Sequence, residues 1–251
     1  SQNNHRRDGA GMKILGLDSS GLVASVAVVE DDTLLSEYTV NHKKTHSQTL
    51  LPMLDEIVRM IELDLNEVDA IAVAAGPGSF TGLRIGSATA KGLGLALDKP
   101  LIAVPTVDAL AYNLYETHGV ICPLMDARRN QVYTGIYEFA DGKFQVISAQ
   151  EAISIEEIIE KINQIGREVI FLGDGVPVFR EKIEADCKVS HHYAPAHVNR
   201  QRAGAVAALG TLYYKEGKVQ NARDHQPEYL RLSQAERERL QREKKNCEEK
   251  K

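Results

Sequence analysis

The chain has 251 residues, of which 43% are hydrophobic and 26% are charged, and its formal net charge is −5. This is the composition of a globular protein long enough to bury a sizeable core, and it excludes a fibrous or disordered chain. The acidic balance argues against tight, direct nucleic-acid binding by this chain alone. No apolar run reaches membrane-spanning length, and the three cysteines lack metal-type spacing, so we expect a cytoplasmic protein.

The two ends of the chain differ in composition from the rest. Residues 1–11, SQNNHRRDGAG, resemble an added expression segment ahead of a native start at Met12. Residues 233–251 consist almost entirely of Glu, Arg, Lys and Gln. Because both signs of charge are mixed there, we expect a solvated helix or tail.

The first half of the chain shows the periodicities of a mixed α/β lobe. Short apolar runs bounded by turn residues predict strands at residues 14–18, 23–29, 33–40, 71–75 and 101–104. The first two enclose Ser-Ser-Gly and predict a hairpin with Asp18 at its bend. Helical spacing of apolar residues predicts helices over 50–61 and 81–97, with Pro52 in the first turn or at a kink. Thr106 is expected to cap a further helix.

The second half repeats this plan. Strands are predicted at residues 121–125, 132–139 and 169–172, and helices after Ser154 and over 202–215. Both halves contain strand–Asp–turn–strand followed later by Gly-x-Gly, with Asp126 in the place of Asp18. The matched order predicts two similar lobes, residues 12–104 and 105–232.

The helix predicted over residues 81–97 is rich in glycine, although each glycine costs about 1 kcal/mol relative to alanine. Gly82, Gly86, Ala90 and Gly94 are spaced four apart and form a ridge almost without side chains, here called the small-residue ridge. Such a ridge lets another helix approach closely. We therefore expect close helix–helix packing at this ridge, either inside the fold or with a partner.

Acids at two hairpin bends are typical of actin-like folds, which hold nucleotide phosphates and a cation between two lobes. The candidate residues are Asp18, Ser19, Ser20, Asp126, Gly173 and Gly175. Small residues follow the first acid, as close approach of a phosphate requires, but Arg128 stands where the second turn would need glycine. We interpret the set as a vestigial nucleotide site; acids that only cap tight turns are the simpler alternative.

Other motif-like segments lack a defining residue. Residues 76–82, GPGSFTG, lack the lysine of a phosphate-binding loop and have the wrong spacing for a dinucleotide site. His42 and His46 are four apart but have no carboxylate at a motif position, so we assign no metal and expect no cofactor. No nucleophile motif is present, and no catalytic residue is assigned.

Six segments resemble, in order, those of the bacterial TsaB proteins: LGLDSS, HSQTLLPMLDEI, AAGPGSFTGLRIGSATAKGLG, MDARRNQVYTGIYE, FLGDG and PEYLR. The resemblance covers about residues 12–232. It implies an α/β, actin-like (ASKHA) fold with two lobes, each a mixed sheet flanked by helices. It also implies a non-catalytic role beside TsaD, which transfers threonylcarbamoyl to the adenosine next to the anticodon of ANN-decoding tRNAs.

The resemblance further implies which partners bind and where. TsaD would bind through the first two helices, the ATPase TsaE would join the complex, and the chain alone would form a homodimer through the same surface. Contact with tRNA would be indirect, and residues 104–108 lack the metal-binding histidine pair that TsaD carries at this place. The implied interface residues are Leu50, Met53, Leu54, Ile57, Gly82, Arg84, Ile85, Gly86, Thr89, Ala90 and Leu93.

Two other classes of function are open alternatives. An actin-fold ATP-dependent kinase or ATPase would bind ATP with magnesium, and Arg128 weighs against it. A glycoprotease-type metalloenzyme would hold zinc or iron, and the missing histidine pair weighs against that.

Overall fold

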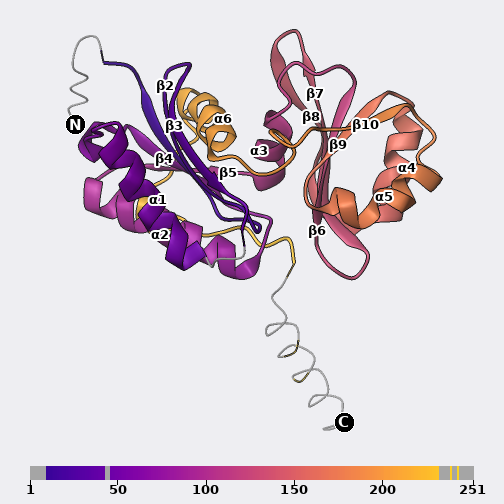
Figure 1. The fold of residues 1–251 in the computed structure, drawn as a ribbon, viewed down its shortest axis with the longest axis horizontal. Helices are drawn as coiled ribbons and strands as arrows, with labels where there is room; N and C mark the ends of the chain where they lie inside the picture. The colour runs from indigo at the N-terminus through magenta and orange to yellow at the C-terminus, as the bar shows by residue number, and fades with distance from the viewer. Residues whose placement is uncertain (1–9, 43–45, 232–237, 239–241, 243–251) are drawn as a thin grey trace.

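A computed structural model of the chain describes residues 10–42 and 46–231, together with residues 238 and 242 (Figure 1). Most of residues 1–11 and of residues 233–251 lie outside the described residues. The described helices and strands form two lobes (Figure 1). None of the described helices is long and apolar enough to cross a membrane.

The first lobe is built on a five-stranded sheet of described residues with the order β3-β2-β1-β4-β5. Its strands are β1 (Lys13–Asp18), β2 (Ala24–Glu30), β3 (Thr33–Val40), β4 (Ala70–Ala74) and β5 (Leu101–Val104). The first three are antiparallel, and β4 and β5 add to β1 in parallel. The predicted hairpin is confirmed, because Asp18 pairs with Ser25 at its end.

The second lobe has a five-stranded sheet with the order β10-β9-β6-β7-β8. Its strands are β6 (Val120–Asp126), β7 (Gln131–Ala140), β8 (Lys143–Ser154), β9 (Val169–Leu172) and β10 (His191–Tyr193). Read from its other edge, this order repeats that of the first sheet strand for strand, with the same parallel and antiparallel pairs. The predicted duplication of the plan is therefore confirmed at the level of topology. The edge strands β8 and β10 were not predicted.

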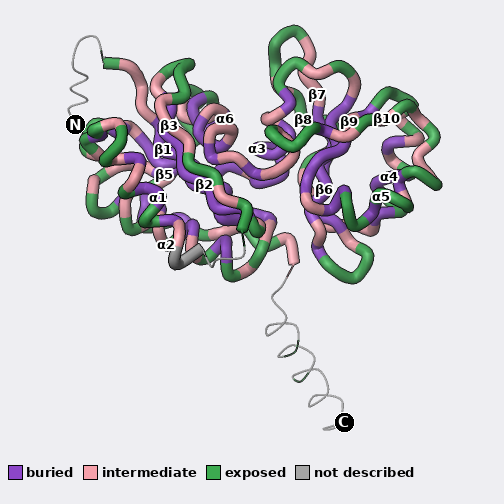
Figure 2. Tube along the Cα trace, viewed as in Figure 1, coloured by how far each residue is buried: buried purple, intermediate pink, exposed green. Residues whose placement is uncertain are grey.

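The helices form layers on both sheets (Figure 1). The outer face of the first sheet carries α1 (His46–Met60) and α2 (Phe80–Leu97), and that of the second carries α4 (Ile155–Ile165) and α5 (Gly175–Asp186). Between the sheets lie α3 (Thr106–Tyr112) and α6 (Ala203–Lys215). Short 3-10 helices span Leu65–Glu67 (η1) and Ala222–Asp224 (η2). Buried residues follow the inner strands of both sheets and β5, whereas β3, β8 and β10 contain none (Figure 2).

The position of α6 corrects the expected lobe boundaries. We expected residues 105–232 to form the second lobe, but α6 packs on the first sheet and η2 packs against α2. Small residues permit this return: a Cβ added at Gly16 of β1 would lie 2.5 Å from the Ala203 carbonyl oxygen, and one at Gly210 would lie 2.8 Å from Ala72 Cβ. The chain thus crosses to the second lobe and comes back to the first.

Three expected helix details can be compared with the structure. Ser154 caps α4 as predicted, because its side chain accepts a hydrogen bond from Glu157 N. Thr106 is not a cap: Pro105 precedes α3, and Thr106 Oγ1 instead accepts from Gly76 N at 3.0 Å. Pro52 lies inside α1, beyond its first turn.

Candidate functional site

The turn after β1 is closed by its own side chains. Asp18, Ser19 and Ser20 are each at most 2% exposed. Asp18 Oδ1 accepts hydrogen bonds from Ser20 N at 3.0 Å and from Ser20 Oγ at 2.6 Å. Ser19 Oγ donates to the Gly82 carbonyl of α2 at 2.8 Å. The polar groups that would face a phosphate are therefore engaged inside the first lobe.

The pKa of Asp18 is shifted by its burial. Burial raises its pKa from 3.8 to about 6, although the two hydrogen bonds from Ser20 act in the opposite direction. Among the described residues, no hydrogen bond or ion pair brings a basic side chain to this carboxylate. A bound cation would lower the pKa of such a carboxylate, so titration of Asp18 is a test for cation binding.

The turn after β6 is held by a second acid. Asp174 Oδ1 accepts from Asp126 N at 2.8 Å, and Asp126 Oδ1 accepts from Arg128 N at 2.9 Å. Gly173 and Gly175 are required by packing, because an added Cβ would lie 2.2 Å from the Leu124 carbonyl oxygen at Gly173 and 2.9 Å from it at Gly175. The six residues of the nucleotide set thus stabilise two tight turns and their neighbours.

The PEYLR segment crosses from one lobe to the other, and we call residues 226–231 the strap. Glu228 N donates to the Ala75 carbonyl at 2.6 Å, and the ring of Tyr229 stacks on Phe80 with centroids 4.8 Å apart. At its far end, Arg231 donates from Nη1 to the Ala127 carbonyl of the second lobe. The strap therefore ties the start of α2 to the turn after β6.

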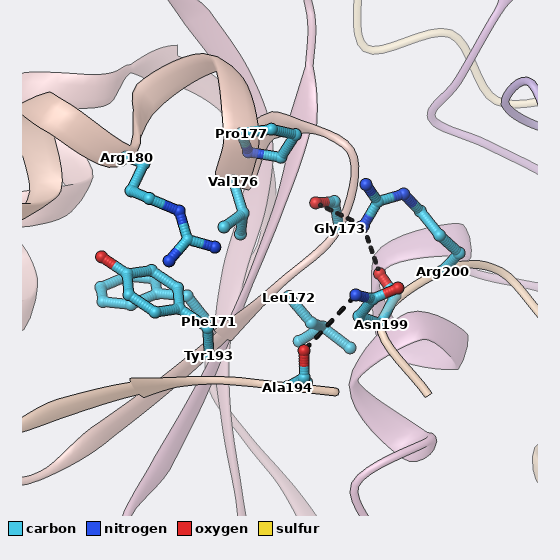
Figure 3. Close-up of a pocket in the computed structure, with 10 residues that line it drawn as sticks. All are labelled: Phe171, Leu172, Gly173, Val176, Pro177, Arg180, Tyr193, Ala194, Asn199 and Arg200. Atoms are coloured by element: carbon cyan, nitrogen blue, oxygen red, sulfur yellow. Dashed lines mark hydrogen bonds between the residues drawn. The ribbon is translucent and has the colours of Figure 1, made fainter. Parts of the chain in front are cut away.

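A small cavity of about 120 Å³ lies at the carboxyl ends of β9 and β10 (Figure 3). Arg180 lies over the ring of Tyr193 at 4.0 Å, and Arg200 Nη1 donates to the Gly173 carbonyl at 3.1 Å. Both guanidinium groups that face the cavity thus have partners within the lobe (Figure 3). Ligand pockets usually measure about 300–1,000 Å³, so this cavity is small for a nucleotide.

A larger cleft of about 560 Å³ lies between β3 and residues 196–202. The ion pair between Arg202 and Glu37, at 3.0 Å, occupies one wall, and Glu37 also accepts from Gly204 N. The Nε2 atom of Gln201 is buried here and has no hydrogen-bond partner among the residues that the structure describes. The cleft has the volume of a ligand site, but two charged residues that line it, Arg202 and Glu37, are already paired with each other.

The small-residue ridge packs inside the protein, which is one of the two alternatives that its sequence left open. A Cβ added at Gly86 would lie 2.6 Å from Ser19 Oγ, and one at Gly94 would lie 2.8 Å from Ala222 Cβ. Ala90 is fully buried in the core of the first lobe. The ridge thus lets α2 approach β1, β4 and η2 of its own chain.

Most residues expected at the interface are likewise buried, on the sides of α1 and α2 that pack against the core of the first lobe. The buried ones are Leu50, Met53, Leu54, Ile57, Gly82, Gly86 and Ala90. Ile85, Thr89 and Leu93 are half-buried, and Arg84 is exposed. The exposed residues of the two helices include Leu51, Met60, Arg84, Ala88, Gly92 and Leu95, which we call the outer helix face, and the charged Asp55 and Arg59 lie exposed beside them on α1.

The comparisons with known proteins agree with each other. The family model for TsaD, described as tRNA N6-adenosine threonylcarbamoyltransferase, matches residues 33–239. The tRNA threonylcarbamoyladenosine biosynthesis protein TsaB of Bacillus subtilis is 33% identical over 225 residues, covering 90% of this chain and 96% of the relative. The chain belongs to the TsaB family. TsaB of Escherichia coli is 32% identical over 167 residues, covering 65% of this chain and 72% of the relative.

The solved structure of YeaZ from Pseudomonas aeruginosa is similar, with a TM-score of 0.75 and 26% identity, covering 87% of this chain and all of that one. The TsaB family is involved in tRNA threonylcarbamoyladenosine biosynthesis. Its fold is actin-like, with two lobes whose sheets share one strand order. The resemblance seen in the sequence is therefore confirmed for both family and fold.

In this TsaB-family chain, the segment after β5 forms a polar connection between the lobes. Asp108 of α3 is 7% exposed and accepts a hydrogen bond from Tyr137 Oη of β7 at 2.5 Å. Burial raises the pKa of the Asp108 carboxyl, and the hydrogen bonds from Tyr137 and Tyr213 oppose the shift. Within the part of the chain that the structure describes, no group of three His, Cys, Asp or Glu side chains could hold a metal. His42 lies exposed in a loop, and the side chain of His46 lies outside the described ones.

Proposed function

We propose that this chain is a non-catalytic subunit of the complex that adds threonylcarbamoyl to the adenosine next to the anticodon of ANN-decoding tRNAs. In this role it binds and supports a TsaD-type catalytic subunit, and a TsaE-type ATPase joins them. The observation that carries the proposal is the internal engagement of the nucleotide set: Asp18, Ser19 and Ser20 are buried in mutual contacts. The exposed Arg128 beside Asp126 adds to this, since a nucleotide phosphate that approaches the backbone of this turn would need a small residue there.

The outer helix face is the surface that we propose for the catalytic partner, and for a homodimer when the chain is alone. Leu51 is 55% exposed, Met60 67% and Leu95 52%, so each of the two neighbouring helices α1 and α2 presents apolar side chains to solvent. Ala88 and Gly92 are exposed on α2, on the same side as Arg84 and Leu95, and leave room for a close approach, since nothing lies within 4 Å of a Cβ added at Gly92. Exposed apolar and small residues along one side of a helix suit helix-on-helix packing between chains.

The proposal is tested by an omission assay. Threonylcarbamoyl-tRNA is measured with the cognate TsaD, TsaE, the adenylate-forming enzyme, threonine, bicarbonate and ATP, with and without this chain. We expect product that depends on this chain, and none when TsaD is the component left out. Equal product with and without the chain would refute a supporting role, and product without TsaD would refute a non-catalytic one.

The surface is tested separately with Ala88→Arg, which places a long charged side chain on the outer helix face without touching the core. We expect loss of the complex with TsaD in size-exclusion chromatography while the circular dichroism spectrum and melting temperature stay unchanged. Ala196→Arg is the matched control, because Ala196 is exposed in the second half of the chain, away from α1 and α2. Retention of the complex by Ala88→Arg would exclude this surface.

A further inference from the structure

The turn between β6 and β7 has a backbone conformation that arginine rarely adopts. Arg128, Arg129 and Asn130 have φ values of 65°, 53° and 60°, so that three successive residues other than glycine are left-handed. Asparagine tolerates this region, whereas a long side chain such as arginine rarely adopts it. Glycine at the two arginine positions would remove the strain.

The strained conformation is fixed by contacts from several elements. Ile155 N donates to the Asn130 carbonyl at 3.2 Å, and Asn130 Nδ2 donates to Glu156 Oε2 at 2.7 Å. On the other side, Arg231 of the strap contacts the Ala127 carbonyl. The turn is therefore hydrogen-bonded on both sides at the place where the strap meets the second lobe.

The two arginine side chains contribute little to the fold that strains them. The side chain of Arg128 is 87% exposed, and its distance to Asp126 Oδ2 is 3.8 Å, a weak ion pair in water. Arg129 is exposed, and no ion pair between it and another described residue is present. The backbone of the turn closes the β6–β7 hairpin, with Gln131 N donating to the Arg128 carbonyl at 3.0 Å, but the two guanidinium groups have no such role. Strained residues whose side chains project into solvent are typical of binding sites.

We propose that Arg128 and Arg129 contact backbone phosphates of the tRNA during modification. The inference rests on the proposed function, which brings a tRNA to the complex, and it adds a direct contact where only an indirect one was expected. Guanidinium groups pair with phosphate oxygens through two parallel hydrogen bonds, and the turn holds the backbone of both arginines at one place. With a net charge of −5, the chain needs the assembled complex to hold the tRNA before these contacts form.

The test measures tRNA binding by the assembled complex at several salt concentrations. Arg128→Gln with Arg129→Gln shortens both side chains only modestly and removes both charges. Each lost phosphate contact reduces the steepness of log K against log salt concentration by about 0.7–0.9, so two lost contacts reduce it by about 1.4–1.8. Taken from equal binding at about 1 M salt, the double variant should therefore bind about 25- to 60-fold more weakly than the unaltered chain at about 0.1 M salt. Arg223→Gln is the matched control, because Arg223 is an exposed arginine on η2, and its affinity should equal that of the unaltered complex.

A second variant separates binding from folding. Arg128→Gly with Arg129→Gly relieves the backbone, so it should raise the urea midpoint of the isolated chain while weakening tRNA binding as the glutamine variant does. Unchanged tRNA affinity and salt slope in both double variants would overturn the inference while leaving the proposed function intact. Loss of complex formation in the absence of tRNA would also overturn it, because the arginines would then bind an acidic protein surface. Failure of the unaltered chain to join the complex would refute the proposed function itself.

Discussion

Replacing Asp18 by asparagine should change how the stability of this TsaB-family protein depends on pH. Asp18 is 1% exposed, and its pKa is about 6 in the folded protein against 3.8 for the free side chain. At about 1.4 kcal/mol for each pKa unit, burying the ionised carboxylate costs about 3 kcal/mol at neutral pH. The amide of the Asp18→Asn variant would keep an oxygen for the two hydrogen bonds from Ser20 and would carry no charge at any pH.

The sign follows from the raised folded-state pKa. The stabilisation from protonated Asp18 is complete below pH 3.8 and is lost as pH rises through about 6. Relative to Asp18→Asn, the unaltered protein should therefore lose stability on going from pH 5 to pH 8, by between about 1 and 2 kcal/mol. Any fixed cost of the asparagine amide cancels in this comparison.

Urea unfolding at pH 5, 6, 7 and 8 provides the measurement, followed by circular dichroism because the chain has no Trp to report by fluorescence. Asp98→Asn, at an exposed helix end, controls for the loss of one negative charge. A difference between Asp18→Asn and the unaltered protein that stays constant across these pH values would refute the argument. If magnesium and ATP abolish the pH dependence, the first turn binds a cation, and the ATPase alternative would be favoured.

Three further predictions concern stability. Gly92→Ala should stabilise the protein by up to about 1 kcal/mol, because its Cβ meets nothing, whereas Gly86→Ala should destabilise it by about 1–3 kcal/mol through overpacking; urea midpoints decide both. His225 is 1% exposed and burial lowers its pKa below 6.5, so stability should fall as pH drops below 6.5, and His225→Gln should remove this dependence in the same titration. Tyr137→Phe should cost about 1–3 kcal/mol, because Asp108 would remain buried with one donor fewer; an unchanged melting temperature would contradict this.

The sequence predicted the elements whose own residues define them. The hairpin at Asp18, the apolar stripe of α1 and the Ser154 cap of α4 each depend on residues within a few positions of one another, and all three are present. The edge strand β8 was missed because Val146 and Ile147 are exposed neighbours and its residues do not alternate as a half-buried strand does.

In the candidate sites too, some features could be predicted from nearby residues and others could not. The turn acids, the glycines and the family could be found from residue types and their order. The sequence could not reveal that Gly86 faces Ser19, that Gly173 faces Leu124, or that the outer helix face consists of residues such as Ala88. A small residue is required wherever something approaches closely, and a linear pattern does not say whether that neighbour belongs to the same chain or to another.

The sequence by itself determined the duplicated strand–turn–strand plan, the helix pair and the family of this protein, because local periodicity and motif order are written along the chain. The tertiary structure alone decided that α6 returns to the first lobe, that the strap joins α2 to the turn after β6, and that the nucleotide set is closed by its own contacts. These features depend on residues far apart in sequence: Ser25 and Ala203, whose side chain and backbone meet at 2.8 Å, are 178 positions apart. Such contacts are set by which surfaces of the folded elements fit together, and short-range patterns do not encode that fit.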